Sequence, residues 1–195
     1  KSEPKILIPV TEDSSGRTSG LAAHPLCDQL KYISCTNEKA HTLYLQTLHA
    51  WMRSPHSHPF LQAVFSYAES GTILSDLTKA GILDSAEHYD EKLLVCWRVH
   101  GFVDEEPACW KNRNLFDAFV AYYCSRVSER GIGFCMIDGK TAPAAVQHPK
   151  GIIPVNGNAK LVSANDTSGF TYRGRFSEEW QAASVGYVAS QKAHS

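Results

Sequence analysis

The sequence has 195 residues, of which 43% are hydrophobic and 20% are charged, and its formal net charge is −1. Such a chain is long enough for one good core or two small domains, and its composition is typical of a globular protein. The near-neutral charge argues against a free-standing DNA-binding domain, because those domains are usually basic. No apolar run approaches the roughly 18 residues of a membrane span and no signal-peptide pattern opens the sequence, so we expect a cytoplasmic protein without a membrane partner.

Helices are predicted for most of the first half of the chain. A short strand at 6–10 comes first and ends in a polar turn. Asn37 has the side chain of a helix N-cap, and the helix that follows is expected to end near Met52, because Pro55 disfavours its continuation. A second helix begins near Pro59 and is closed by Gly71, and a short third helix occupies 73–80.

Strands are then predicted on both sides of one long helix. The apolar run at 92–99 predicts a buried strand, and the next segment, 101–109, is an acidic loop. Asn112 or Asn114 is expected to cap a helix that Gly131 ends. The apolar face of this helix comprises Leu115, Phe116, Phe119, Val120, Tyr123, Cys124 and Val127.

The last third is predicted to contain short strands, loops and one more helix. A strand at 132–137 leads into a type I′ hairpin turn at Asp138 and Gly139, since both residues tolerate positive φ. Short strands and loops continue to Tyr172. Ser177 is expected to cap a final helix that reaches Ser195 without a stop signal, which indicates that the natural chain continues.

Together these elements predict an α+β fold, with N-terminal helices, a central strand and helix, a small strand-and-loop region and a C-terminal helix. We expect a helical part at 36–83, a mixed α/β part at 92–176 and the start of a longer helix at 177–195.

Patterns typical of enzymes and metal sites are missing from the sequence. Neither Cys96 nor Cys109 lies in the small-residue turn of a papain-like nucleophile, and there is no G-x-S-x-G and no phosphate-binding loop. His56 and His58 lack a third ligand and are expected in a solvated loop. The six cysteines contain no C-x-x-C pair, which indicates buried reduced thiols. We therefore predict that the protein is not an enzyme and holds no cofactor or metal.

Charge is unevenly distributed along the chain. Residues 84–106 are acidic and are expected to be solvated or to face a basic partner. Residues 138–176 are basic and can meet phosphate. The basic side chains of that stretch are Lys140, Lys150, Lys160, Arg173 and Arg175, against Asp138 and Asp166.

Four blocks of sequence, in their order and spacing, resemble one protein family. The blocks are 16–21 with 24–28 and Tyr32; 95–101 with Trp110; 135–139 with 148–150; and 157–166 with 170–174, extended by a helix at 187–194. They resemble the large subunit of the type I-C CRISPR effector complex (Cascade), in the Csd family. The resemblance spans essentially the whole chain and implies a fragment from the N-terminal half of a longer subunit.

The resemblance implies a subunit without a catalytic site. In that family the large subunit recognises the protospacer-adjacent motif in target double-stranded DNA, aids strand opening and recruits a helicase-nuclease. Its further partners are Cas-five-type and Cas-seven-type subunits and, indirectly, the 5′ handle of the crRNA. Guide pairing reads the rest of the target, as in a related single-protein effector.

The side chains between 150 and 175 suit contact with DNA. Asn offers a donor and acceptors, Gly lets the backbone approach closely, and Lys and Arg attract phosphate. We predict that DNA contacts Asn156, Asn158, Lys160, Asn165, Arg173 and Arg175, with Lys150 and Arg17 as second choices. The alternative is that this segment only forms turns.

Other functions stay open at this point. The chain could contact only other subunits or the helicase-nuclease, or it could be an unrelated cytosolic enzyme with a cysteine or histidine centre. Phe170 and Tyr172 share one face at strand spacing and are expected to fill a core, with a wedge between bases as the alternative.

Overall fold

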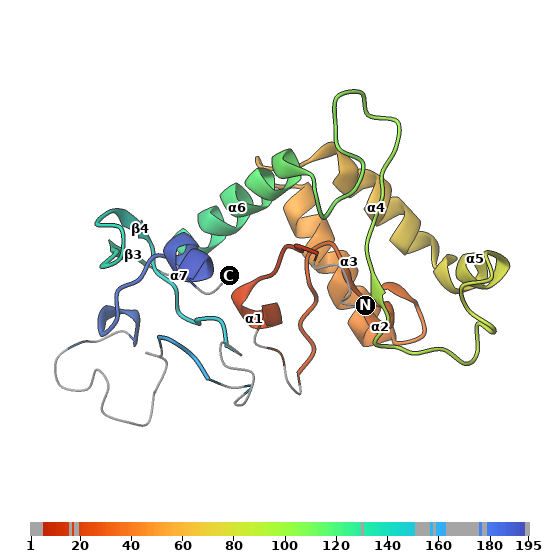
Figure 1. Ribbon diagram of the computed structural model, residues 1–195, viewed down its shortest axis with the longest axis horizontal. Coiled ribbons are helices and arrows are strands. Elements are labelled where there is room, and N and C mark those ends of the chain that lie inside the picture. Colours follow the sequence, from red (N-terminus) through yellow and green to blue (C-terminus); the bar gives the residue numbers. More distant parts are fainter. Residues whose placement is uncertain are drawn as a thin grey trace. The chain divides into compact units, whose positions relative to one another are not determined.

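The computed structural model describes residues 6–15, 17, 20–129, 131–150, 157, 159–162, 176 and 179–193. The chain divides into two compact units, one formed by 1–14 and 19–122 and the other by 15–18 and 123–195. Helices make up most of the regular structure, and the strands are short antiparallel pairs (Figure 1). The predicted α+β class is confirmed.

The two long helices of the first unit begin and end close to the predicted positions, whereas the two short helices before them were not predicted. After the short helices α1 (Glu12–Ser15) and α2 (Leu30–Ile33) come α3 (Glu38–Met52), α4 (Pro59–Ser70) and α5 (Ile73–Lys79). The Asn37 side chain accepts a hydrogen bond from the Ala40 N–H. Gly71 ends α4 with a φ of 68°, a conformation that other residues adopt at a cost.

Aromatic side chains form the core between these helices. Trp51 of α3 is fully buried, and its ring lies 5.3 Å from that of Phe119 and 6.0 Å from that of Tyr122. Tyr44 and Phe60 are also fully buried. Such large rings exclude much apolar surface from water and dominate the stability of a small core.

The strands predicted for this unit are largely absent. Residues 6–10 form no strand. Of the predicted strand at 92–99, only Leu94–Val95 (β2) forms a strand, paired with Asp28–Gln29 (β1), and Leu94 is 43% exposed instead of buried. Further on, Arg98 bridges to Ala108, so 94–99 lies between two other segments of the chain.

The helix α6 (Arg113–Ser128) is capped by Asn112, whose side chain accepts from the Leu115 N–H at 2.9 Å. Asn114 instead donates to Glu105. The predicted apolar face is correct in part, because Val120 is 39% exposed and Tyr122 is buried. The buried residues of α6 are Leu115, Phe119, Tyr122, Tyr123 and Val127.

In the second unit, β3 (Ile132–Phe134) and β4 (Thr141–Pro143) form the predicted hairpin. Its turn is not type I′, since Gly139 has a φ of 69° but Asp138 does not have a positive φ. The Gly139 N–H donates to the Cys135 carbonyl and the Cys135 N–H to the Lys140 carbonyl. The turn is therefore a longer loop with one left-handed residue at its end.

The predicted final helix is interrupted. A 3-10 turn, η1 (Glu179–Gln181), precedes α7 (Tyr187–Ala193), and the predicted cap Ser177 lies outside the described residues. Gly186 between them bridges to Ala144. Residues 184–186 form backbone hydrogen bonds and a bridge with the hairpin and the segment after it. The backbone of 184–186 is therefore extended and interrupts the predicted helix. Cys135, Val185 and Ala189 form the core beneath.

Candidate nucleic-acid interface

Most of the residues predicted to contact DNA lie outside the described part of the chain. The residues concerned are Asn156, Asn158, Asn165, Arg173 and Arg175. The aromatic residues Phe170 and Tyr172 also lie outside the described part. Arg17, Lys150 and Lys160 are described, and all three are partly exposed. They belong to the same compact unit, although Arg17 is far from the lysines in sequence.

A buried histidine fixes the chain next to Lys150. His148 is 5% exposed, and its Nδ1 lies 2.8 Å from the Ser190 Oγ of α7. The Ala145 N–H donates to the Val185 carbonyl, so the segment 144–148 lies alongside the segment 185–190. The contact between His148 and Ser190 is structural. The anchored histidine places Lys150 two residues away at a defined point of the second unit.

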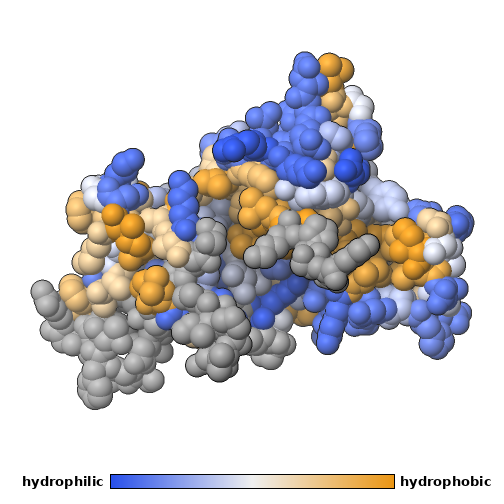
Figure 2. All heavy atoms as spheres, in the orientation of Figure 1, coloured by the Kyte–Doolittle hydropathy of each residue, from blue (hydrophilic) through white to orange (hydrophobic). Residues whose placement is uncertain are grey.

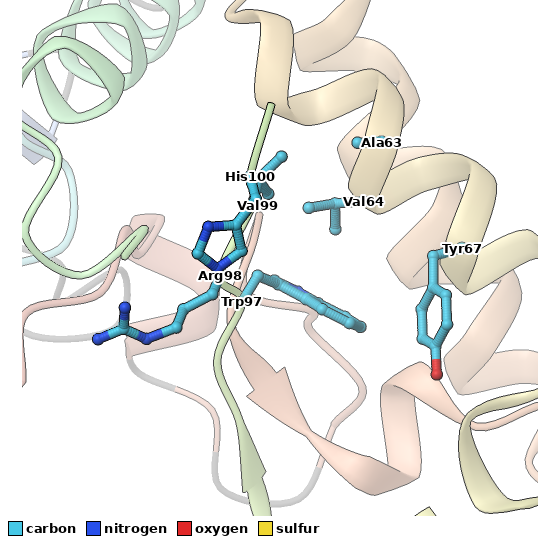
Figure 3. Close-up of a pocket in the computed structure, with 7 residues that line it drawn as sticks. All are labelled: Ala63, Val64, Tyr67, Trp97, Arg98, Val99 and His100. Atoms are coloured by element: carbon cyan, nitrogen blue, oxygen red, sulfur yellow. The ribbon is translucent and has the colours of Figure 1, made fainter. Parts of the chain in front are cut away.

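The first unit contains a cavity of about 360 Å³ between α4 and the segment 97–100. Figure 3 shows Trp97 projecting from that segment toward Val64 and Tyr67 of α4, with the Arg98 guanidinium pointing away from them. The lining residues are Ala63, Val64, Tyr67, Trp97, Arg98, Val99 and His100. The cavity is a largely apolar slot, lined by α4 on one side and by the segment 97–100 on the other.

Hydrogen bonds hold the Trp97 wall in position. Its indole N–H donates to the Leu26 carbonyl at 2.9 Å and lies 3.2 Å from the Tyr44 hydroxyl, which itself donates to Leu26. Because Tyr44 is fully buried in α3, the indole is tied to the core of the unit. A wall fixed in this way has little conformational entropy left to lose when a ligand binds.

The opposite wall is fixed through an acidic residue. The Tyr67 hydroxyl donates to Asp76 of α5 at 2.9 Å, and Thr72 donates to the same carboxylate at 2.8 Å. These bonds, from Thr72 first and then Tyr67, lower the pKa of Asp76. The Tyr67 and Trp97 rings meet edge to face, with centroids 5.6 Å apart. The two rings are therefore in direct contact, and a flat, weakly polar group such as a nucleobase would pack against them and not between them.

Positive charge lies beside the slot. Arg98 is exposed, and its guanidinium carbon lies 5.3 Å from the centre of the Trp110 ring. His100, which is also exposed, is the second basic side chain of the lining. The Arg98 guanidinium points away from Val64 and Tyr67, so its charge lies outside the slot (Figure 3). The sequence singled out neither Trp97 nor Tyr67 as a binding residue, so sequence reasoning missed this cavity.

One of the two loop histidines is buried. His58 is 6% exposed, which corrects the prediction of a solvated loop. It caps α4 by accepting from the Phe60 N–H, and its other nitrogen faces Glu105 at 3.7 Å. Within the described ranges, no group of three or more His, Cys, Asp or Glu residues is placed to hold a metal ion. In the same ranges, no helix is long and apolar enough to cross a membrane.

Comparison with known proteins gives one match. A family described as CRISPR-associated protein (Cas_Csd1) matches residues 1–195. No curated protein and no solved structure matches the chain. The match covers both compact units and every residue that was predicted to contact DNA.

Proposed function

Because the chain belongs to the Cas_Csd1 family of CRISPR-associated proteins, we propose that it is part of the non-catalytic large subunit of a crRNA-guided type I-C Cascade complex. The match across residues 1–195 is the observation that carries this proposal. The subunit recognises the protospacer-adjacent motif in target double-stranded DNA, aids strand opening and recruits the helicase-nuclease. It works beside Cas-five-type and Cas-seven-type subunits, close to the 5′ handle of the crRNA.

DNA contact is assigned to the basic segment of the second unit. Lys150 and Lys160 supply attraction for phosphate that does not depend on sequence, and Arg17 belongs to the same unit. Asn156 and Asn158 offer the donors and acceptors that can read base edges. The near-neutral net charge suits a subunit whose neighbours supply the rest of a basic channel.

Strand opening is assigned to the aromatic slot of the first unit. Stacking of a displaced base on an aromatic side chain contributes roughly 1–3 kcal/mol per base, which offsets part of the cost of unpairing it. Replacing Tyr67 by Ala should slow the opening of a target duplex by the assembled complex. Tyr67→Phe is the matched control, because it keeps the ring and loses only the hydrogen bond to Asp76.

The decisive experiment measures duplex binding by the assembled complex. Asn156, Asn158, Arg173 and Arg175 are each replaced by Ala, and affinity for duplexes with and without the motif is measured at two salt concentrations. Replacing a residue that reads the motif should remove the complex's preference for duplexes that carry it. Replacing a residue that binds phosphate should weaken binding to every duplex and flatten the slope of log K against log salt by about 0.9 per lost contact. Wild-type behaviour of all four variants would refute DNA recognition by this segment.

One observation favours a second function, that of a scaffold within the same complex that does not touch DNA. The β3–β4 hairpin exposes Ile132, Phe134, Met136 and Ile137 by 56%, 62%, 67% and 56%. Figure 2 shows hydrophobic atoms, in orange, at the surface in the region where Figure 1 draws the hairpin. Apolar surface of this kind is typical of a subunit contact. If polar replacements there release the subunit from the complex and the DNA variants have no effect, the scaffold function is correct.

A further inference from the structure

Two cysteines of the first unit lie opposite each other at the end of the β1–β2 pair. Asp28 pairs with Val95 and Gln29 with Leu94. Cys27 precedes Asp28 and Cys96 follows Val95, so the next pair in the same register is Cys27 and Cys96. Residues opposite each other in an antiparallel pair project their side chains to the same side. The two thiols therefore lie on one face of the pair.

The hydrogen-bond pattern makes this position suitable for a disulfide. The Leu30 N–H donates to the Leu93 carbonyl at 2.8 Å, so Leu30 and Leu93 occupy a hydrogen-bonded position. Positions alternate along an antiparallel pair, and Cys27–Cys96 falls on a non-hydrogen-bonded one, where Cα atoms are about 4.5 Å apart. Disulfides span Cα separations of about 4.4–6.8 Å. The cysteines can therefore be joined with little movement of the backbone.

The surroundings of the two sulfur atoms differ. Cys27 is fully buried, whereas Cys96 is partly exposed. A hydrogen bond from Cys27 lowers the pKa of the Cys96 thiol, and the same bond together with burial raises the pKa of Cys27. Thiolate character and exposure are the two properties that make a cysteine oxidisable. Of the two thiols, Cys96 is the more exposed and has the lower pKa, and Cys27 is the adjacent thiol.

A third cysteine is close but less suited to react. The Cys109 N–H donates to the Trp97 carbonyl at 3.1 Å, which places Cys109 on the other side of the segment that carries Cys96. It is fully buried, and burial raises the pKa of its thiol to about 12. Cys109 is therefore expected to stay reduced under conditions that oxidise Cys96.

We propose that Cys96 is a peroxide-sensitive modification site that forms a reversible disulfide with Cys27. The Cys96 thiolate attacks hydrogen peroxide, which breaks the O–O bond and leaves a sulfenic acid after the released hydroxide is protonated. The Cys27 sulfur then attacks the Cys96 sulfur, which forms the S–S bond and displaces water. In sum, two thiols and one hydrogen peroxide give one disulfide and two waters, and a thiol reductant reverses the change.

The disulfide joins two segments that are far apart in sequence, beside the Trp97 wall of the slot. Closing a long loop restricts the unfolded chain, so the oxidised protein should unfold at a higher temperature than the reduced one. This inference does not rest on DNA binding, because it concerns only the chemistry and stability of the first unit.

The test uses the full 195-residue chain, treated with hydrogen peroxide, alkylated without reduction and mapped by peptide mass spectrometry. We expect a cross-link between the Cys27 and Cys96 peptides that dithiothreitol removes, together with a higher melting temperature that dithiothreitol reverses. Cys109→Ser should form the same cross-link. Cys27→Ser should leave Cys96 as a sulfenic acid that dimedone traps.

The wild-type chain keeps the test decisive even if Cys27→Ser does not fold. Cys35 is exposed and serves as an internal measure of oxidation. If Cys35 is oxidised and Cys27 and Cys96 remain thiols, the proposal is wrong. A cross-link of Cys96 to Cys109 as the main product would overturn it equally, because the register would then not determine the partner.

Discussion

Two asparagines start the two longest helices, in different surroundings. The Asn37 side chain, which is partly exposed, accepts one hydrogen bond from the Ala40 N–H. The Asn112 side chain is 1% exposed and makes three bonds. It accepts from the Leu115 N–H and donates to the Glu105 carboxylate at 2.8 Å and the Glu106 carbonyl at 2.9 Å. The first site needs only an acceptor, and the second needs an acceptor and donors.

Replacement by Asp should therefore be nearly neutral at position 37 and destabilising at position 112. Asn37→Asp keeps a good N-cap and should leave the free energy of unfolding near that of the wild type. Asn112→Asp keeps the cap but removes both donors and places a carboxylate against Glu105, so it should cost about 1–3 kcal/mol. Chemical denaturation with urea measures both, and Asn37→Ala provides the reference of about 1 kcal/mol for losing a cap. Equal effects of the two Asp variants would contradict this account of Asn112.

His58 should make stability depend on pH. Its Nδ1 accepts from the Phe60 N–H, so the neutral ring carries its proton on Nε2, facing Glu105. Burial lowers the pKa of His58 below the ordinary value of 6.5, although Glu105 opposes the shift. The folded state then binds a proton less readily than the unfolded state, so stability falls as pH drops through 6.5 toward the folded pKa.

The measurement is the free energy of unfolding at pH 7.5 and at pH 5.5. His58→Asn keeps a side chain that can cap α4 and should reduce the loss of stability between the two values. His88→Asn, at an exposed position, is the matched control and should behave like the wild type. Glu105 does not confuse the result, because hydrogen bonds from Asn112 and Asn114 lower its pKa and its contribution is lost only below about pH 4.5.

At the scale of elements, the contact between β3 and η1 depends on a missing side chain. A Cβ atom added at Gly133 would lie 2.5 Å from the Trp180 ring. Gly133→Ala must therefore displace Trp180 and should cost about 1–3 kcal/mol, with a shift in Trp180 fluorescence. Gly157→Ala is the control, since nothing lies within 4 Å of an added Cβ there. An unchanged fluorescence spectrum in Gly133→Ala would contradict this packing.

The long helices and the β3–β4 hairpin could be predicted from local signals, and the pairing of β1 with β2 could not. Asn37, Pro59 and Gly71 act on residues within one or two turns, so the ends of α3 and α4 follow from the sequence. The run at 92–99 has the composition of a strand, but only two of its residues pair with β1. Pairing depends on which distant segment lies alongside, and 28–29 is too short and polar to signal that it is the partner.

The candidate site shows the same division. The residues predicted to contact DNA came from family resemblance and residue chemistry, and five of them lie outside the described part of the chain. The slot was missed because its two sides, α4 and the segment 97–100, are far apart in sequence and meet only in the folded chain. Trp97 has the composition of a core residue. Only the structure shows that its indole N–H is bound to Leu26 and Tyr44 and that its side chain lines the slot.

At the scale of the whole molecule, the acidic stretch 84–106 is less free to attract a partner than its sequence predicts. Glu105 bonds to Asn112 and Asn114, and Glu106 accepts from the Ala108 N–H. Asp90 accepts from the Lys92 N–H. Several of its carboxylates therefore hold the loop before α6 and the approach to β2. The surface that best fits a protein partner is instead the apolar one on the β3–β4 hairpin.

That hairpin should make the isolated chain self-associate. Ile132 and Phe134 alternate with Gly133 and so share the open face of β3, whereas Gly133 faces Trp180. Without a neighbouring subunit, a second copy of the chain is the apolar surface available to cover them. Ile132→Ser with Phe134→Ser should shift sedimentation velocity toward monomer. Val103→Ser, which alters a loop residue that is 88% exposed, should leave association unchanged. If the wild-type chain is monomeric at high concentration, the hairpin face is too small to hold a partner by itself, and the scaffold function loses its support.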